Sequence, residues 1–177
     1  PIKWMPFGID NKIFKDYGLP KIFDVVIYGS LNQRVYPQRD AARKVLTSMG
    51  GIRLVDLCGN NKYNVELAKI INQSRIGIAT SCSNKLVLQK HYEIPACRTL
   101  MFTDRPRNGW DELFGSDHYV IFNDGCADLA QKIKWWLSNP NRLQQMADGG
   151  YKHVHAKYTN AHIVKLFEEF IMELNNG

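Results

Sequence analysis

Short apolar runs alternate along the chain with longer amphipathic segments. Segments with apolar residues at helical spacing predict helices near Tyr36–Met49, Val65–Asn72 and Leu88–Cys97. Runs rich in β-branched and aromatic residues predict five buried strands, at Phe23–Tyr28, Ile52–Leu57, Arg75–Thr80, Thr99–Thr103 and Tyr119–Phe122. Strands that alternate with helices in this way indicate βαβ units. We therefore expect an α/β fold whose parallel sheet is sandwiched by helices.

Three further helical stretches are expected at the C-terminal end. The first covers about 129–137, with Asn123 or Asp124 as its cap and Pro140 as its end. The second covers about 143–154. The third carries an apolar stripe of Ile163, Leu166, Phe167, Phe170, Ile171 and Leu174. We interpret four aromatic residues of this region as core or interface: Trp135, Trp136, Phe167 and Phe170.

The N-terminal twenty residues combine Pro, Gly and aromatic residues without periodicity, which is typical of an irregular connecting segment. We therefore divide the chain into a connecting segment (1–20), a ligand-binding domain (21–158) and a C-terminal helix (159–177). Because the chain begins at Pro1 in the middle of such a segment, we also expect an N-terminal part to precede it.

Composition and charge exclude several classes of protein. With 45% hydrophobic and 23% charged residues among 177, the chain is neither disordered nor in need of disulfides to fold. The net charge of +6 is scattered, without a run of five Lys or Arg. This pattern disfavours a nucleic-acid tail and leaves an anionic membrane, phosphate-bearing ligands or a plain solvated basic surface open.

The cysteines and the lack of long apolar runs bear on location. Cys58, Cys82, Cys97 and Cys126 are spaced too widely and irregularly for a zinc site or a disulfide framework. Free thiols predict a cytoplasmic protein. No apolar run approaches the roughly 18 residues of a membrane span, so we expect no span. No metal and no cofactor is predicted.

Candidate chemistry follows from the carboxyl ends of the predicted strands. In open parallel sheets, ligands bind beyond the carboxyl ends of the strands. This places four polar loops at the ligand edge, 29–34, 58–61, 81–85 and 103–107. Gly29 and Ser30 could present backbone N–H groups to an anion, and Arg34 could add a cation. A plain turn and a solvated arginine are the alternatives at this point.

Glu93 is the most informative single residue. It follows the 81–85 loop on a predicted helix, where its carboxylate could accept hydrogen bonds from the vicinal hydroxyls of a ribose. A surface pair with Lys90 or Gln89 is the alternative, although the apolar residues after Glu93 favour burial. The five histidines form no metal pattern, and we find no nucleophile–histidine pair, so the catalytic residues are unknown.

Several stretches together resemble one family. FDVVIYGSLNQRVYPQR resembles the first strand and glycine loop of the C-terminal, donor-binding domain of GT-B glycosyltransferases. WMPFGIDNKIF, NQSRIGIATS and HYEIPACRTLMFTDRP are similar to that family's linker region, donor-site strand and Glu-containing block. The likeness covers nearly the whole chain and is closest to CgeB-like and glycosyl transferase group 1 proteins. It implies a single Rossmann-like domain.

The resemblance implies roles for individual residues. Glu93 matches the glutamate that binds the ribose of the donor, and Gly29, Ser30 and Arg34 match the loop near its diphosphate. The sequence departs from the family at Lys85, where another glutamate often contacts the sugar, and at Arg98, which replaces a glycine. The full set of expected donor-binding residues is Gly29, Ser30, Leu31, Arg34, Gly59, Ser81, Ser83, Lys90, Glu93 and Arg98.

The implied function is transfer of a sugar from a nucleotide diphosphate sugar to an unknown acceptor. The acceptor side would come from a missing N-terminal domain, so the chain alone is expected to bind donor weakly and to be inactive. The expected ligand is a nucleotide-sugar. Two alternatives stay open: a non-catalytic basic α/β module that binds nucleotide or nucleic acid, and a nucleotide-sugar epimerase.

Overall fold

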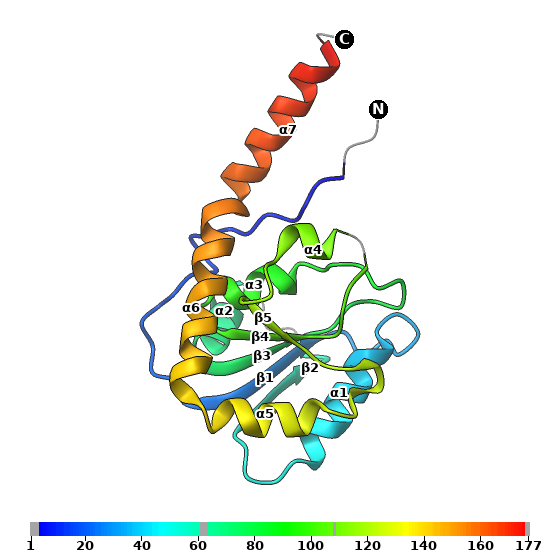
Figure 1. Ribbon diagram of the computed structural model, residues 1–177, viewed down its shortest axis with the longest axis vertical. Coiled ribbons are helices and arrows are strands. Elements are labelled where there is room, and N and C mark those ends of the chain that lie inside the picture. Colours follow the sequence, from blue (N-terminus) through cyan, green and yellow to red (C-terminus); the bar gives the residue numbers. More distant parts are fainter. Residues whose placement is uncertain (1–3, 61–63, 108, 176–177) are drawn as a thin grey trace.

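In the part of the chain that the structure describes, five parallel strands form one sheet at the centre of the molecule (Figure 1). The computed structural model describes residues 4–60, 64–107 and 109–175. The strand order is β2-β1-β3-β4-β5. The strands are β1 (Phe23–Gly29), β2 (Leu54–Cys58), β3 (Ser74–Ala79), β4 (Leu100–Thr103) and β5 (Tyr119–Ile121). The predicted α/β fold and its parallel sheet are therefore confirmed.

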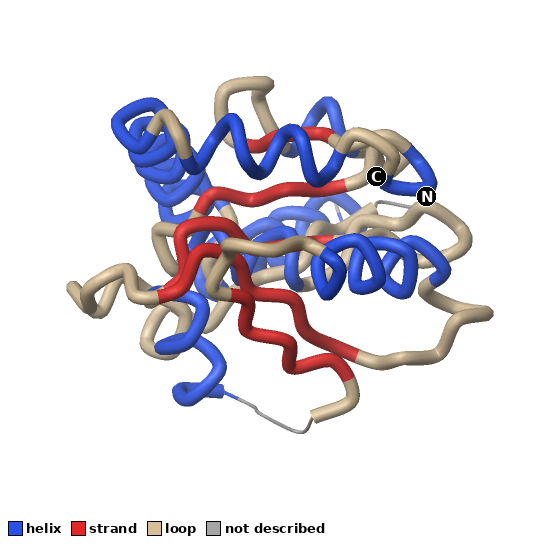
Figure 2. Tube along the Cα trace, turned by 90° about the horizontal axis from the view of Figure 1, so that it is seen from below, coloured by secondary structure: helices blue, strands red, loops and turns tan. Residues whose placement is uncertain are grey.

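Helices cover both faces of the sheet (Figure 2). They are α1 (Pro37–Ser48), α2 (Asn64–Asn72), α3 (Lys90–Ala96), α4 (Trp110–Leu113), α5 (Leu129–Leu137), α6 (Pro140–Lys157) and α7 (Asn160–Asn175), with a short 3₁₀ turn at Asp124–Cys126. Helices α1 and α5 pack on one face and α2, α3 and α4 on the other, whereas α6 contributes to both cores.

The alternation of side chains along the strands produces these two cores. In β1, Val25 and Ile27 enter the core under α1 and α5, while Val26 and Tyr28 enter the core under α2 and α3. Helix α3 lies very close to the sheet, because a Cβ at Gly77 of β3 would sit 2.7 Å from a methyl carbon of Ile94. A glycine in that strand thus allows the helix that carries Glu93 to approach the sheet.

The C-terminal helix differs from the others. None of the residues of α7 is buried, and the helix extends away from the body beside the N-terminal segment (Figure 1). Its start is fixed by two backbone hydrogen bonds, from Ile9 N to Tyr158 O (2.9 Å) and from Asn160 N to Ile9 O (2.8 Å). In the described residues, no helix is both long enough and apolar enough to cross a bilayer.

The structure corrects several local expectations. Asn123 and Asp124 do not cap α5, because the chain kinks at Gly125 and α5 starts after Asp128. Pro140 opens α6 rather than ending α5, as its missing N–H allows at a first turn. Helix α4 and the 3₁₀ turn were not predicted, since segments of four and three residues are too short to show a helical period.

The expectation for the aromatic residues holds only in part. Trp136 is 8% exposed and belongs to the core, but Trp135 (46%) and Phe167 (54%) are exposed. A core role is therefore wrong for these two residues, and an interface role stays a prediction.

Candidate functional site

A cleft at the carboxyl ends of β1 and β2 brings most of the expected residues together. Two adjoining hollows of about 520 and 510 Å³ share five lining residues, Tyr28, Gly29, Ser30, Gln89 and Glu93. The first hollow adds Leu31 and Gly59, and the second adds Arg39 and Lys90. We call the two hollows together the Gly29 cleft.

Gly29 shapes the floor of the cleft. Its φ of +110° lies in a region that L side chains rarely adopt, so a glycine is favoured there. A Cβ at this position would sit 2.8 Å from the Lys90 Nζ and 2.9 Å from a terminal nitrogen of Arg39. The missing side chain therefore leaves space in which two cations approach the end of β1.

Lys90 and Arg39 form this cation pair. Lys90 is only 8% exposed, donates a hydrogen bond to Tyr28 O (2.6 Å), and lies over the Tyr28 ring. Arg39 is 3% exposed, donates to Ser30 O (2.8 Å), and stacks on the Tyr36 ring at 4.0 Å. Its Nε finds no hydrogen-bond partner among the described residues. Neither side chain forms a salt bridge with a described carboxylate.

Buried cations of this kind are costly unless an anion joins them. Burial and the neighbouring Arg39 lower the pKa of Lys90 to about 7. Burial also lowers the pKa of Arg39. The electrostatics of the cleft therefore favour a negatively charged ligand, and the backbone at Gly29–Ser30 lies where that ligand would sit.

Glu93 lines both hollows of the cleft and is held by Tyr28. The Tyr28 hydroxyl donates a 2.8 Å hydrogen bond to Oε2 of Glu93. Burial raises the pKa of Glu93, while the hydrogen bond from Tyr28 and the charge of Lys90 oppose the rise. The carboxylate keeps further lone pairs with which it can accept hydrogen bonds from a ligand. The alternative of a Glu93–Lys90 surface pair is not what the structure shows.

Leu31 and Gly59 complete the lining of the first hollow. The Gly59 N–H donates to Gly29 O (3.0 Å), which ties the loop after β2 to the end of β1. A Cβ at Gly59 would sit 3.1 Å from the Leu31 side chain, which is itself 43% exposed. The cleft thus offers an apolar surface next to its cations. Asn61, the last residue of this expected loop, lies outside the described residues.

Ser81 and Ser83 belong to a neighbouring polar network rather than to the cleft lining. Buried Asp104 accepts hydrogen bonds from Ser81 N (2.7 Å), from the Ser81 hydroxyl and from Lys85 Nζ (2.9 Å). Lys85 also pairs with Asp124, and its two carboxylate partners raise its pKa although burial opposes this. Ser83 is exposed and donates its N–H to Val35 O. Ser81 therefore anchors the loop after β3.

The two arginines expected at the site have different outcomes. Arg34 lies on the exposed loop after Ser30, near the cleft but outside its lining. Arg98 follows α3 at the opposite edge of the sheet, where it pairs with Asp16 (3.1 Å) and Asp148 (2.6 Å). Arg98 is close to Glu93 in sequence, but it lies beyond the C-terminal end of α3. We therefore remove Arg98 from the site.

Sequence reasoning missed Arg39 and Tyr28. Arg39 lies one turn before Ala42 on the buried face of α1, so a cation at an apolar position was a readable signal. Tyr28 is the last side chain of β1 before Gly29, on the same face as Val26. In the described residues, no three His, Cys, Asp or Glu side chains gather closely enough to hold a metal ion.

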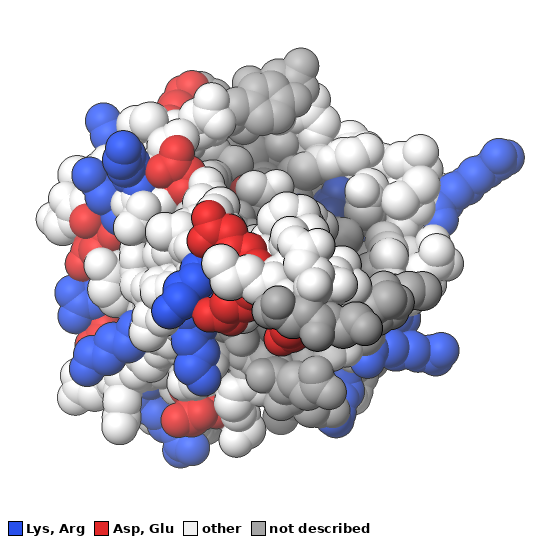
Figure 3. Space-filling model, turned by 90° about the horizontal axis from the view of Figure 1, so that it is seen from above, with Lys and Arg blue, Asp and Glu red and all other residues white. Residues whose placement is uncertain are grey.

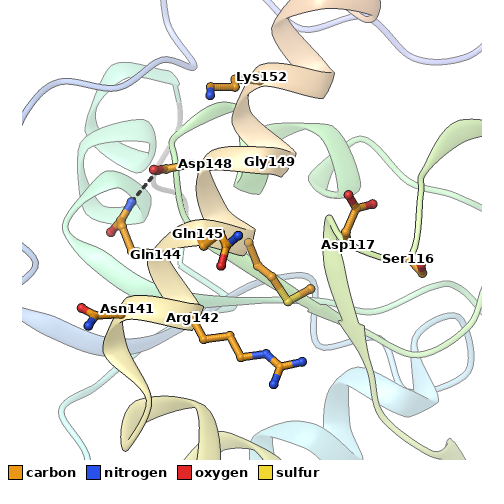
Figure 4. Close-up of a pocket in the computed structure, with 10 residues that line it drawn as sticks. Ser116, Asp117, Asn141, Arg142, Gln144, Gln145, Asp148, Gly149 and Lys152 are labelled. Carbon is orange, nitrogen blue, oxygen red and sulfur yellow. Dashed lines mark hydrogen bonds between the residues drawn. The ribbon is translucent and has the colours of Figure 1, made fainter.

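A larger hollow of about 820 Å³ lies at the other edge of the sheet (Figure 4). It is lined by polar residues of α6 and of the loop before β5, among them Asp117, Arg142 and Lys152. The labelled side chains splay apart, and the only bond drawn joins Gln144 to Asp148. Unlike the Gly29 cleft, its described lining holds no buried cation without a salt bridge, so we do not regard it as the site.

The described surface also bears on the nucleic-acid alternative. Seen from above, basic and acidic side chains lie next to one another on the left part of the visible face, whereas the charged side chains that project on the right are basic (Figure 3). Where charges of both signs lie so close together, they do not make the one-sided basic surface that tracks a phosphate backbone.

Comparison with known proteins places the fold and the family. The family model described as glycosyl transferase-like matches residues 15–169. The chain is 15% identical to the Anabaena protein Alr3699/HepE, solved in complex with UDP-glucose, with a TM-score of 0.73 over 97% of this chain and 57% of that one. No curated protein matches the chain in sequence.

Two further structures resemble the chain. Sucrose-phosphate synthase from Thermosynechococcus elongatus is 14% identical, with a TM-score of 0.69 over 99% of this chain and 53% of that one. The C-terminal domain of a glycosyl transferase group 1 protein (LpcC) from Francisella tularensis is 14% identical, with a TM-score of 0.66 over 86% of this chain and 100% of that one. The chain thus spans about half of the longer relatives.

Strand order, layers and these likenesses define an α/β domain of the GT-B type. Because the family model covers most of its length, the chain belongs to the glycosyl transferase-like family.

Proposed function

We propose that the chain binds the nucleotide diphosphate of a sugar donor in the Gly29 cleft, as the donor half of a glycosyltransferase. The observation that carries the proposal is the pair of buried cations, Arg39 and Lys90, which lack salt bridges to described carboxylates and flank Gly29. A diphosphate supplies the negative charge that this pair lacks. The HepE protein, solved in complex with UDP-glucose, supports the same ligand class here.

Each group of the cleft has a role in this proposal. Arg39, Lys90 and the N–H groups at Gly29–Ser30 hold the diphosphate, and Glu93 accepts hydrogen bonds from the ribose hydroxyls. Leu31 and Gly59 flank the nucleoside. During transfer, the same cations stabilise the charge that develops on the leaving diphosphate. Arg34 lies on the exposed loop after Ser30, outside the lining of the cleft, and its contact with a phosphate stays a prediction.

The acceptor side belongs to a second domain in this proposal. Residues 1–20 connect to that domain, residues 21–158 bind the donor, and the C-terminal segment of 159–177 accompanies the connection. We expect the chain alone to bind donor weakly and not to turn it over. A cytoplasmic location stays a prediction, which the four free cysteines support, and so does the CgeB-like subtype.

Calorimetric titration with UDP, GDP and ADP and their sugar derivatives tests the proposal. One nucleotide is expected to bind, and Arg39→Met is expected to weaken it while the exposed Lys134→Met leaves it unchanged. Absence of binding by every nucleotide at millimolar concentration contradicts donor binding by this chain. Equal affinity in the Arg39→Met variant contradicts the cleft as its place.

A further inference from the structure

The cation pair of the Gly29 cleft poses an electrostatic conflict in the absence of ligand. The Lys90 Nζ and a terminal nitrogen of Arg39 both lie within 2.9 Å of one point, the position of a Cβ on Gly29. Both residues are more than nine-tenths buried. Two like charges so close together in a poorly solvated place repel one another strongly.

The groups around Lys90 relieve this conflict only in part. The titratable or charged residues that face it are Tyr28 from β1, Cys58 from β2, Arg39 from α1, Tyr36 just before α1, and His91 and Glu93 from α3. Among them only the Glu93 carboxylate carries negative charge at neutral pH, and it accepts its hydrogen bond from the Tyr28 hydroxyl. Burial raises the pKa of Cys58 to about 11 and lowers that of His91 to about 4, so both stay neutral.

Of the two cations, only lysine can lose its proton. A guanidinium stays charged in proteins, whereas a buried ammonium gives up its proton readily. A neutral amine can still donate its hydrogen bond to Tyr28 O, so the local geometry survives the loss. The electrostatic surroundings agree with this reasoning, because burial and Arg39 bring the pKa of Lys90 to about 7.

We propose that Lys90 is largely neutral in the empty cleft at mildly alkaline pH and takes up one proton from solvent when a nucleotide diphosphate binds beside Arg39. The inference rests on the proposed function and adds a proton to its binding step. The ligand brings negative charge against the amine, which restores the preference for the ammonium form. The amine nitrogen gains the proton, the solvent buffer loses it, and no bond to the ligand is broken.

The direction of the pH dependence follows from this linkage. Well below pH 7 Lys90 already carries its proton, so the affinity for the diphosphate does not change with pH through this group. Above pH 7 the fraction of empty clefts in which Lys90 is protonated falls about tenfold per pH unit. The apparent affinity for the diphosphate falls with this fraction. A rise in pH therefore weakens donor binding at pH values well below the pKa of an ordinary lysine.

Calorimetry measures the proton directly. The chain is titrated with UDP, or with GDP or ADP if one of these binds instead, at about pH 8 in Tris and in HEPES, whose ionisation enthalpies differ. The terminal phosphate of the nucleotide is already ionised there, since a phosphate monoester has its second pKa near 6. The dependence of the observed enthalpy on the buffer gives the number of protons taken up. We expect Lys90 to take up about one proton on binding at this pH and close to none at about pH 6.

Variants separate Lys90 from other groups. Lys90→Met is expected to bind the nucleotide more weakly, without the proton uptake at about pH 8 and with an affinity that is flat from neutral to alkaline pH. Lys134 is a surface lysine of α5, and Lys134→Met is expected to keep both the affinity for the nucleotide and the proton uptake. If Lys90→Met fails to fold, two measurements on the unaltered chain still test the inference. They are its proton uptake on binding at about pH 8 and its nucleotide affinity as a function of pH.

The outcomes distinguish this inference from the function on which it rests. Nucleotide binding with no proton uptake at about pH 8, or uptake that persists in Lys90→Met, overturns the role of Lys90 and leaves donor binding in place. Absence of binding by all three nucleotides at any pH overturns the donor site itself and the inference with it. Binding with one proton that disappears in Lys90→Met supports both.

Discussion

The cations at the carboxyl ends of the strands and those at the amino ends differ in their partners. At the carboxyl edge, Lys90 and Arg39 are buried without a described carboxylate in salt-bridge contact. At the opposite edge, Arg98 is 42% exposed and lies between Asp16 and Asp148, which raise its pKa. A cation that forms salt bridges with carboxylates of the chain contributes to the folded structure. A buried cation without such a partner destabilises the fold until an anionic ligand binds.

Lys85 shows that the difference is not simply one of position. It lies at the same edge as the Gly29 cleft, but Asp104 and Asp124 bind it and raise its pKa, whereas the pKa of Lys90 falls. The pairing of a cation, and not its place alone, thus indicates whether it is available to a ligand. Four substitutions test this comparison.

Gly29→Ala is expected to have the largest effect. The added Cβ pushes both cations away from the end of β1, so nucleotide affinity falls about hundredfold by calorimetry, as for the loss of more than one charged hydrogen bond. The strained φ also lowers the free energy of unfolding in urea by about 2 kcal/mol. Gly51→Ala is the matched control, because its φ is +76° and nothing lies near its Cβ. It is expected to lose stability but not affinity; similar affinity losses in both variants contradict the account.

Arg39→Met is expected to separate binding from stability. The loss of a charged contact to the diphosphate weakens nucleotide binding by about 2 kcal/mol, or about thirtyfold. Removal of a buried cation that has no carboxylate leaves the free energy of unfolding unchanged or raises it. Calorimetry and urea unfolding of the same sample measure both quantities. A clear loss of stability with unchanged affinity would make Arg39 a structural residue.

Glu93→Gln is expected to affect the nucleoside and not the phosphates. The amide is a weaker acceptor for ribose hydroxyls, so affinity for the bound nucleotide falls about tenfold. Affinity for inorganic diphosphate, which has no ribose, is expected to stay the same or rise slightly as negative charge is removed. Equal losses for both ligands in parallel titrations would place Glu93 at the phosphates instead.

Arg98→Met is expected to have the smallest effect and no effect on binding. Its ion pairs are partly exposed, so the free energy of unfolding falls by about 1 kcal/mol or less. High salt should reduce this difference between the variant and the unaltered chain, because salt screens exposed pairs. Nucleotide affinity by calorimetry should not change. A loss of affinity would return Arg98 to the site.

The sequence predicted the parts that follow from periodicity and strand-end position. The apolar runs indicate all five of the described strands. The rule for parallel sheets places Gly29 at the ligand-binding end of the sheet, and the helix after the 81–85 loop places Glu93 near it. Arg98 was placed wrongly, because closeness in sequence to Glu93 does not reveal that a helix carries the two residues to opposite edges. Arg39 is not found from sequence, because the apolar residues of α1 mark a buried face without showing that a cation shares it.

What sequence could not provide is the pairing of charges. Lys85 and Lys90 are two lysines only five positions apart, and nothing near them in the sequence shows which of them has a carboxylate partner. Only the fold brings Asp104 and Asp124 to Lys85 and Arg39 to Lys90. Contacts between residues far apart in the chain decide which cation has a carboxylate, and local patterns carry no information on them.

The central claim is that a nucleotide diphosphate binds between Gly29 and Glu93. Its most direct test is an NMR titration of the ¹⁵N-labelled chain with the nucleoside diphosphate that binds in calorimetry. The account predicts the largest shifts of backbone amide signals at Gly29, Ser30 and Gly59 and around Glu93, with little change near Arg98. Shifts centred on Arg98 and Asp148, or the absence of any shift at saturating nucleotide, would contradict it.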